Sequence, residues 1–126
     1  MATVVDIKVL VVENITSIKV VILKGQVDES NLKDLSNVLD KLVEDKDTKY
    51  IVLNLKELEF MNSKVVGYLA SLYSSLAEQG KKLVIVEANE TILDILSLVG
   101  LTSIIENYTS LEEAIEVIKT DIEEES

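Results

Sequence analysis

The residues best suited to chemistry in this 126-residue chain stand together in one short polar segment, Asn62-Ser63-Lys64. They supply an amide, a hydroxyl and an ammonium group between a hydrophobic run at Ile51–Leu55 and an apolar pattern of helical spacing that starts at Val65. A helix that begins here presents free backbone N–H groups and the positive end of its dipole. The segment therefore predicts a place for an anion or a phosphorylated side chain.

The rest of the chain offers few groups for catalysis. Cysteine and histidine are absent, and all 12 basic residues are lysine. These absences exclude disulfides, thiolate metal sites, imidazole acid–base chemistry and bidentate arginine–phosphate recognition. The carboxylates lie in patterns typical of solvated edges and helical faces, with no arrangement that suggests a metal or an acid–base pair. We expect a protein that is not an enzyme and that needs no metal and no cofactor.

Charge and length limit the partners and the setting of the protein. The net charge of −11 opposes binding to nucleic acid, whose phosphates attract a positive surface. No apolar run approaches the roughly 20 residues that span a membrane, and the first residues lack the pattern of a secretory signal. We expect a cytoplasmic protein without membrane insertion. It forms one domain over residues 1–126, with a core from about 4 to 118 and an acidic tail from about 119 to 126.

The first part of the chain reads as a hairpin followed by a helix. Two strand-like runs, Val4–Glu13 and Ser17–Lys24, flank the short connection Asn14-Ile15-Thr16, which implies an antiparallel pair. Leucines at steps of three and four then predict an amphipathic helix over residues 32–42, with Asp28 or Ser30 as the residue that caps its start.

Strands and helices alternate through the remainder. We predict a strand at Tyr50–Leu55, a helix at Ser63–Glu78, a strand at Lys82–Glu87, and a short helix with a capping box at Thr91 and Asp94. A brief strand at Ile104-Ile105 and a last helix capped by Ser110 complete the pattern. This order predicts an α/β fold with a mixed, mostly parallel sheet, an N-terminal hairpin and about four helices.

With that order, the chain resembles the STAS domain, the module of bacterial anti-sigma factor antagonists. The similar segments are Gly25-Gln26-Val27-Asp28, Val52-Leu53-Asn54-Leu55, Met61-Asn62-Ser63-Lys64-Val65-Val66-Gly67, Ile95-Leu96-Ser97-Leu98-Val99-Gly100-Leu101 and Tyr108-Thr109-Ser110-Leu111-Glu112-Glu113-Ala114. They cover the chain from about Val4 to Ile118 in the order of the family. The resemblance implies a STAS-type fold and a regulatory, protein-binding function.

The sequence departs from the family at its regulatory motif. Aligned back from Gly67, the phosphorylated hydroxyl of the family falls on Lys64, its preceding acidic residue on Asn62 and its first glycine on Val65. Ser63, the neighbour of the usual acceptor, keeps its identity. Two interpretations stay open for Ser63, which either caps the helix or accepts the phosphate. Lys64 is either a tolerated surface residue or a contact for an acidic partner or an anion.

The resemblance implies that the partner is an anti-sigma factor or a related switch protein of the serine-kinase fold. Docking would use Asn62, Ser63, Lys64, Val65 and Val66 at the start of the helix, with the loop around Asp28. In the family the unmodified antagonist sequesters the anti-sigma factor, and phosphorylation breaks the contact; here that switch is either missing or displaced to Ser63. Because neighbours on a helix point about 100° apart, one of Val65 and Val66 is expected at the surface as an apolar anchor.

Alternatives remain at this stage. The capping role of Asp28 competes with a contact to the partner. The protein is alternatively a STAS scaffold, a partner subunit associated with a transporter, or a domain that binds a nucleotide or a small anion. A homodimer is a further alternative.

Overall fold

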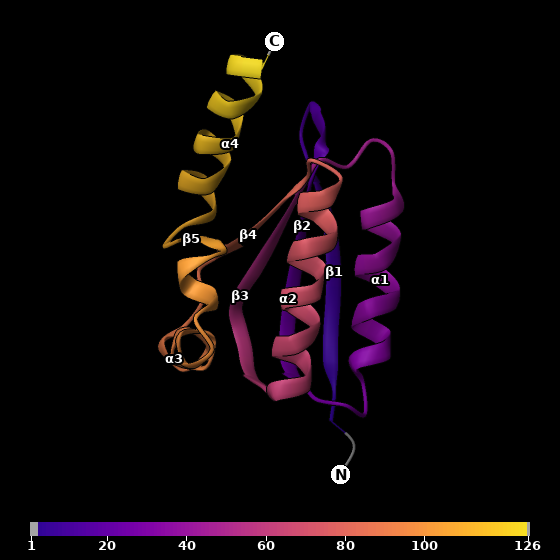
Figure 1. Ribbon diagram of the computed structural model, residues 1–126, viewed down its shortest axis with the longest axis vertical. Helices are drawn as coiled ribbons and strands as arrows, with labels where there is room; N and C mark the ends of the chain where they lie inside the picture. The colour runs from indigo at the N-terminus through magenta and orange to yellow at the C-terminus, as the bar shows by residue number, and fades with distance from the viewer. Residues whose placement is uncertain (1–2, 126) are drawn as a thin grey trace.

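The computed structural model describes residues 3–125 as a five-stranded sheet with helices on both faces (Figure 1). The strands are Val5–Val12 (β1), Ile15–Val27 (β2), Tyr50–Met61 (β3), Lys82–Val86 (β4) and Glu106–Tyr108 (β5). The helices are Leu32–Glu44 (α1), Ser63–Glu78 (α2), Glu90–Leu98 (α3) and Leu111–Glu125 (α4), with a short 3₁₀ turn, η1, at Leu101–Ser103. The predicted order of elements is confirmed.

The sheet is mixed, as the sequence predicts. Its strands lie in the order β1-β2-β3-β4-β5, so that each strand is a neighbour of the next one along the chain. The β1 and β2 strands form an antiparallel hairpin, and the three other pairs are parallel. Parallel neighbours need crossover connections, which α1, α2 and α3 with η1 supply.

Two apolar cores lie on opposite faces of the sheet. Alternate residues of β3 point to opposite sides, so Ile51 and Leu53 join the core beneath α1, α2 and α3, while Val52 joins the core beneath α4. The same alternation divides β4 between Ile85 on the first face and Val84 on the second. Helices therefore cover both sides of the central strands, which explains why these strands are nearly continuous apolar runs.

The hairpin turn is tighter than predicted. Strand β2 begins at Ile15, and Asn14 makes the turn in the left-handed region at φ 64°. Strand β2 also continues beyond the predicted end at Lys24, through Gly25 to Val27. Gly25 has φ 111°, and a Cβ atom at this position would lie 2.4 Å from the carbonyl oxygen of Val4. A glycine is therefore required for β1 and β2 to approach each other here.

Strand β3 is twice as long as the predicted Tyr50–Leu55 and ends at Met61. Its second half pairs with the continuation of β2, from Lys24 to Val27, but not with β4, whose pairing with β3 ends at Asn54. The charged residues in this half of β3 interrupt the apolar run by which the strand is predicted from the sequence. The free edge is covered by α3, since the Asn89 side chain donates to the carbonyl of Leu58 at 2.7 Å.

The predicted helix starts need two corrections. The N-cap of α1 is Asn31 rather than Asp28 or Ser30, and its side-chain oxygen accepts the backbone N–H of Asp28 instead of capping the helix. The N-cap of α3 is Asn89 rather than Thr91, because the Asn89 side chain accepts the N–H of Ile92 at 3.0 Å.

The cap of α4 is as predicted. The Ser110 hydroxyl accepts the N–H of Glu113 at 3.1 Å. The Glu87 side chain adds a bond that the sequence did not suggest, since it accepts the N–H of Leu111 at 2.9 Å. Glu87 has φ 55°, a left-handed conformation at the end of β4. The first turn of α4 is therefore held by its own cap and by the turn after β4.

The prediction of a strand at Ile104-Ile105 is wrong. Gly100 adopts a left-handed conformation and leads into η1, and the N–H groups of Ile104 and Ile105 both donate to the carbonyl of Leu101. These two residues therefore belong to the turn. Pairing with β4 begins only at Glu106.

A buried lysine closes α1. The Lys81 ammonium donates to the carbonyls of Val43 at 2.6 Å and Asp45 at 2.9 Å, which lie at the end of the helix. A cation at this end satisfies carbonyls that lack partners in the helix and complements its dipole. Lys81 therefore connects the start of β4 to α1.

We predict that Lys81→Met lowers the free energy of unfolding by about 1–3 kcal/mol, because it leaves two partly buried carbonyls without a donor. The neighbouring Lys82→Met is the matched control. Lys82 is exposed and pairs with Asp121 at 3.4 Å, so its loss costs less than about 1 kcal/mol. Urea unfolding of the three proteins measures both values, and equal losses would contradict the role of Lys81.

Candidate functional site

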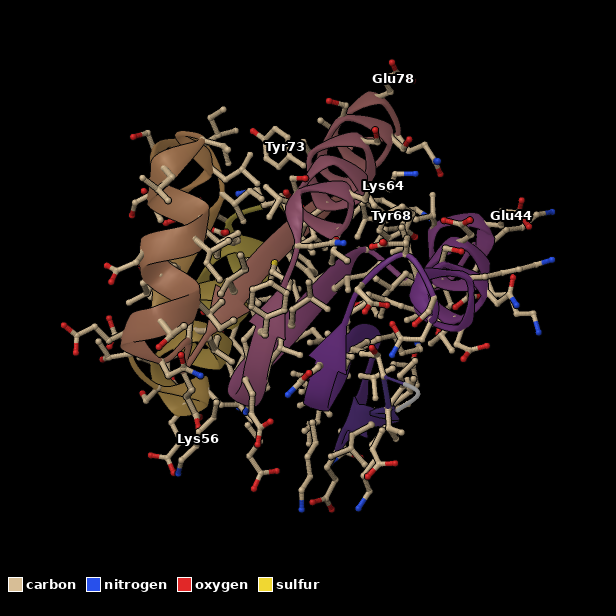
Figure 2. The ribbon with its side chains drawn as sticks, turned by 90° about the horizontal axis from the view of Figure 1, so that it is seen from below. Glu44, Lys56, Lys64, Tyr68, Tyr73 and Glu78 are labelled. Carbon is tan, nitrogen blue, oxygen red and sulfur yellow. The ribbon has the colours of Figure 1, made fainter. Side chains whose placement is uncertain are left out.

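The polar segment predicted to do chemistry lies at one end of the sheet. Strands β2 and β3 both end there, and α1 and α2 both begin there, at the lower end of the molecule in Figure 1. Figure 2 looks onto this end and labels Lys64 in the first turn of α2. We call residues 28–31 and 60–66 the α2 corner.

Asn62, not Ser63, caps α2. Its side-chain oxygen accepts the N–H of Val65 at 3.2 Å, and its amide donates to the carboxylate of Glu29 in the loop before α1. The interpretation of Ser63 as the N-cap is therefore wrong, because Asn62 occupies that position with extended backbone. Asn62 also ties the two loops of the α2 corner together.

Ser63 and Lys64 are the first two residues of α2, and both are exposed. Within residues 3–125, neither side chain makes a hydrogen bond or an ion pair, and their backbone N–H groups have no acceptor. The first turn of α2 contains no acidic residue. The helix therefore presents a hydroxyl, an ammonium group and two free N–H donors to solvent, which suits a negatively charged group.

Val65 and Val66 are both buried, with 1% and 5% of their surfaces exposed. The prediction that one of them is a surface anchor is wrong. Helix α2 lies against α1 as well as the sheet, and both valines join the same core. A helix covered on two sides buries an arc wider than the 100° between neighbouring residues, so both valines can be buried at once.

The sequence did not single out Phe60 as the exposed apolar residue of the α2 corner. Its side chain is 45% exposed. Leu58 of β3 pairs with Gly25, but the next residue of β2, Gln26, pairs with Phe60. Glu59 is therefore the extra residue of a β-bulge, which breaks the alternation and leaves Phe60 at the surface next to Asn62. A register shift of this kind has no clear signal in one sequence.

Asp28 organises the loop before α1. Its carboxylate accepts the hydroxyl and the N–H of Ser30 at 2.5 and 2.8 Å, and the hydroxyl of Thr3 at 2.6 Å. These hydrogen bonds lower the pKa of Asp28 below its usual value. The bond from the Ser30 hydroxyl has the largest effect, and the bond from Thr3 the next largest. Asp28 is thus ionised near neutral pH and engaged within the chain. A contact to a partner stays a prediction.

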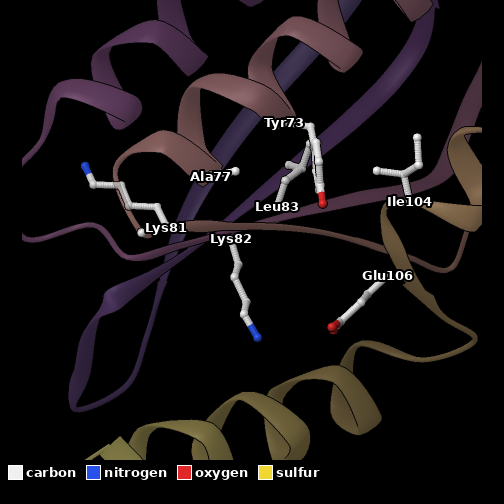
Figure 3. Close-up of a pocket in the computed structure, with 8 residues that line it drawn as sticks. Tyr73, Ala77, Lys81, Lys82, Leu83, Ile104 and Glu106 are labelled. Carbon is white, nitrogen blue, oxygen red and sulfur yellow. The ribbon is translucent and has the colours of Figure 1, made fainter.

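A cavity of about 300 Å³ lies at the opposite end of α2, where Tyr73, Leu83 and Ile104 contribute to its wall (Figure 3). Its charged groups are already paired. Lys82 bonds to Asp121, and the Glu106 carboxylate accepts the hydroxyl of Tyr108 at 3.0 Å. The cavity therefore offers little to a nucleotide or a small anion. No group of acidic residues in residues 3–125 is arranged to hold a metal ion.

Comparison with known proteins matches the chain to one family over most of its length. The family model described as the STAS domain matches residues 9–114. The anti-sigma F factor antagonist of Paenibacillus polymyxa is 25% identical over 96 residues, which are 76% of this chain and 82% of that protein.

Solved structures show the same fold. An anti-sigma factor antagonist from Mycobacterium paratuberculosis superposes with a TM-score of 0.81 at 21% identity, covering 92% of this chain and 95% of that one. The anti-sigma factor antagonist SpoIIAA in its unphosphorylated form has a TM-score of 0.77 at 19% identity, with 91% and 97% covered. Among the helices of residues 3–125, none has the length and apolar character to cross a membrane.

We predict that Asn62→Ala lowers the free energy of unfolding by about 1 kcal/mol, because it removes the cap of α2 and the link to Glu29. Ser63→Ala serves as the control and changes stability by less than about 0.5 kcal/mol, since its hydroxyl has no partner. Thermal and urea unfolding provide the measurement. A larger loss of unfolding free energy for Ser63→Ala than for Asn62→Ala would show that Ser63 is the residue that caps α2.

Proposed function

The chain belongs to the STAS domain family, and we propose that it acts as an anti-sigma factor antagonist that binds an anti-sigma factor through the α2 corner. The family match and the names of the relatives support the kind of partner. A single observation supports the α2 corner as the binding site. Ser63 and Lys64 are exposed at the N-terminus of α2, where their backbone N–H groups have no acceptor within the described chain.

Lys64 is the proposed polar contact. A lysine in the first turn opposes the helix dipole and typically costs about 0.3–1 kcal/mol, and no neighbour in residues 3–125 neutralises it. An acidic side chain of the partner would offset this cost and use the free N–H groups of the same turn. Phe60, nearly half exposed two residues before the N-cap of α2, would supply the apolar part of the contact.

Ser63 is the proposed site of regulation. Since Asn62 caps α2, the Ser63 hydroxyl is not needed for the fold, and it is exposed and unbonded within the described chain. A phosphate there would bring up to two negative charges to the start of a helix. It would occupy the free N–H groups and attract the Lys64 ammonium, thereby withdrawing both from an acidic partner. The switch of the family would thus be displaced by one residue.

The proposed role is binding without catalysis. The α2 corner combines an amide, hydroxyls, an ammonium group and carboxylates. The exposed Ser63 hydroxyl has no base held against it in the described chain, and the Ser30 hydroxyl that donates to Asp28 belongs to the hydrogen bonds that order the loop before α1. We also propose that the protein meets its partner in the cytoplasm, which the naming of its relative as an anti-sigma factor antagonist supports.

We predict that Lys64→Glu weakens binding to the anti-sigma factor by about tenfold or more, because a carboxylate would face an acidic partner. Immobilised protein would capture its partner from the native host, and titration calorimetry with the identified protein would give Kd. Lys46→Glu, the matched control, changes the same charge in the loop after α1, at the other end of the molecule. Equal affinities for both variants would remove Lys64 from the interface.

We also predict that the cognate kinase with ATP phosphorylates Ser63, and that the modified protein loses its partner. Tryptic peptides that cover residues 57–64 locate the phosphate by mass spectrometry, and Ser63→Ala is the control that abolishes it. If the kinase fully phosphorylates a known substrate but leaves residues 60–69 of this chain unmodified, the chain would instead be a binder that phosphorylation does not switch off.

A further inference from the structure

Strand β1 is an open edge of the sheet. It pairs with β2 on one side, and nothing in residues 3–125 pairs with its other side. The Val4 carbonyl accepts the N–H of Gln26 at 3.0 Å, so Val4 directs its backbone groups toward β2. Because this direction alternates along an antiparallel strand, Val5, Ile7 and Val9 direct their N–H and C=O groups outward.

This edge is apolar and neutral on an acidic protein. Three successive residues, Val9, Leu10 and Val11, are 40%, 41% and 53% exposed. The charges of the strand are those of Asp6 and Lys8, which cancel, while the chain as a whole carries −11. Proteins usually protect such an edge with proline, several lysines or a covering segment. Strand β1 has no proline and a single lysine.

We propose that the β1 edge binds a second copy of this chain, as an antiparallel strand pair centred on Ile7. The two sheets would join into one sheet of twice the width around a twofold axis. In this register Val5 of each copy lies opposite Val9 of the other, and Ile7 lies opposite Ile7. All of these residues direct their backbone groups outward, so they form about six hydrogen bonds between the copies.

Charge complementarity selects the register. With Ile7 at the centre, Asp6 of each copy lies opposite Lys8 of the other, which gives two reciprocal ion pairs. These are non-hydrogen-bonded positions, where side chains across an antiparallel pair approach most closely. A pairing centred on Lys8 would oppose the two lysines. One centred on Val9 would leave both charges facing apolar residues, Val12 and Leu10.

The proposal is independent of the proposed function. The β1 edge contains no residue of the α2 corner, and its test needs only the purified chain. Sedimentation equilibrium of the wild-type protein between about 1 and about 500 µM, at constant salt, measures the Kd of the dimer. Reversing one charge, by Asp6→Lys or Lys8→Asp, places like charges opposite each other twice and weakens the dimer by about tenfold or more. The double swap Asp6→Lys/Lys8→Asp restores the complementary pairs and the dimer.

Lys46→Asp is the control for Lys8→Asp, since it makes the same change in net charge at a distant loop and leaves Kd within about threefold. Circular dichroism and thermal unfolding verify that each variant keeps its fold. A wild-type chain that stays monomeric up to the highest concentration overturns the proposal. A dimer that tolerates both single reversals, or that the double swap fails to restore, overturns the pairing of Asp6 with Lys8.

Discussion

The parallel pairing of β2 with β3 is the constraint on which the α2 corner depends. The two strands pair from Ile18 and Tyr50 to Val27 and Met61, well beyond the end of β4. This shared length brings the loop before α1 and the start of α2 to the same height, so that Asn62 reaches Glu29 across the two crossovers. The bulge at Glu59 belongs to this pairing too and sets the exposure of Phe60.

Periodicity predicted most of the fold. The helix predicted at about Ser63–Glu78 agrees with α2, because an apolar stripe marks the helix and Gly80 follows closely on its end. The caps were harder to predict. Asparagine and serine cap helices about equally well, so the residue types do not distinguish Asn62 from Ser63 as the cap. The backbone conformation does, because Asn62 is extended and α2 begins at Ser63.

The start of α2 was predicted correctly along the chain, but the exposure of the side chains around it was predicted only in part. The exposure of Ser63 and Lys64 follows from the position of the helix start. The burial of both Val65 and Val66 depends on how closely α1 lies against α2, and the exposure of Phe60 depends on a register shift between strands. Both are long-range properties, to which no local pattern in the sequence is sensitive.

Two lysines show how the same residue type serves opposite ends of a helix. Lys81 donates to carbonyls at the end of α1, where a cation stabilises the helix, and it is buried there. Lys64 stands at the start of α2, where a cation is unfavourable, and it is exposed without a partner in the described chain. Stability accounts for the first lysine and not for the second, which is the reason that we propose Lys64 for recognition.

The ends of the described chain lie at opposite poles of the molecule, which matters for any fusion protein. Thr3 hydrogen-bonds to Asp28 and so belongs to the neighbourhood of the α2 corner, whereas α4 ends at the far pole (Figure 1). A fluorescent label or affinity tag appended after α4 would leave the corner accessible. One placed ahead of Thr3 would crowd the surface that we propose for binding.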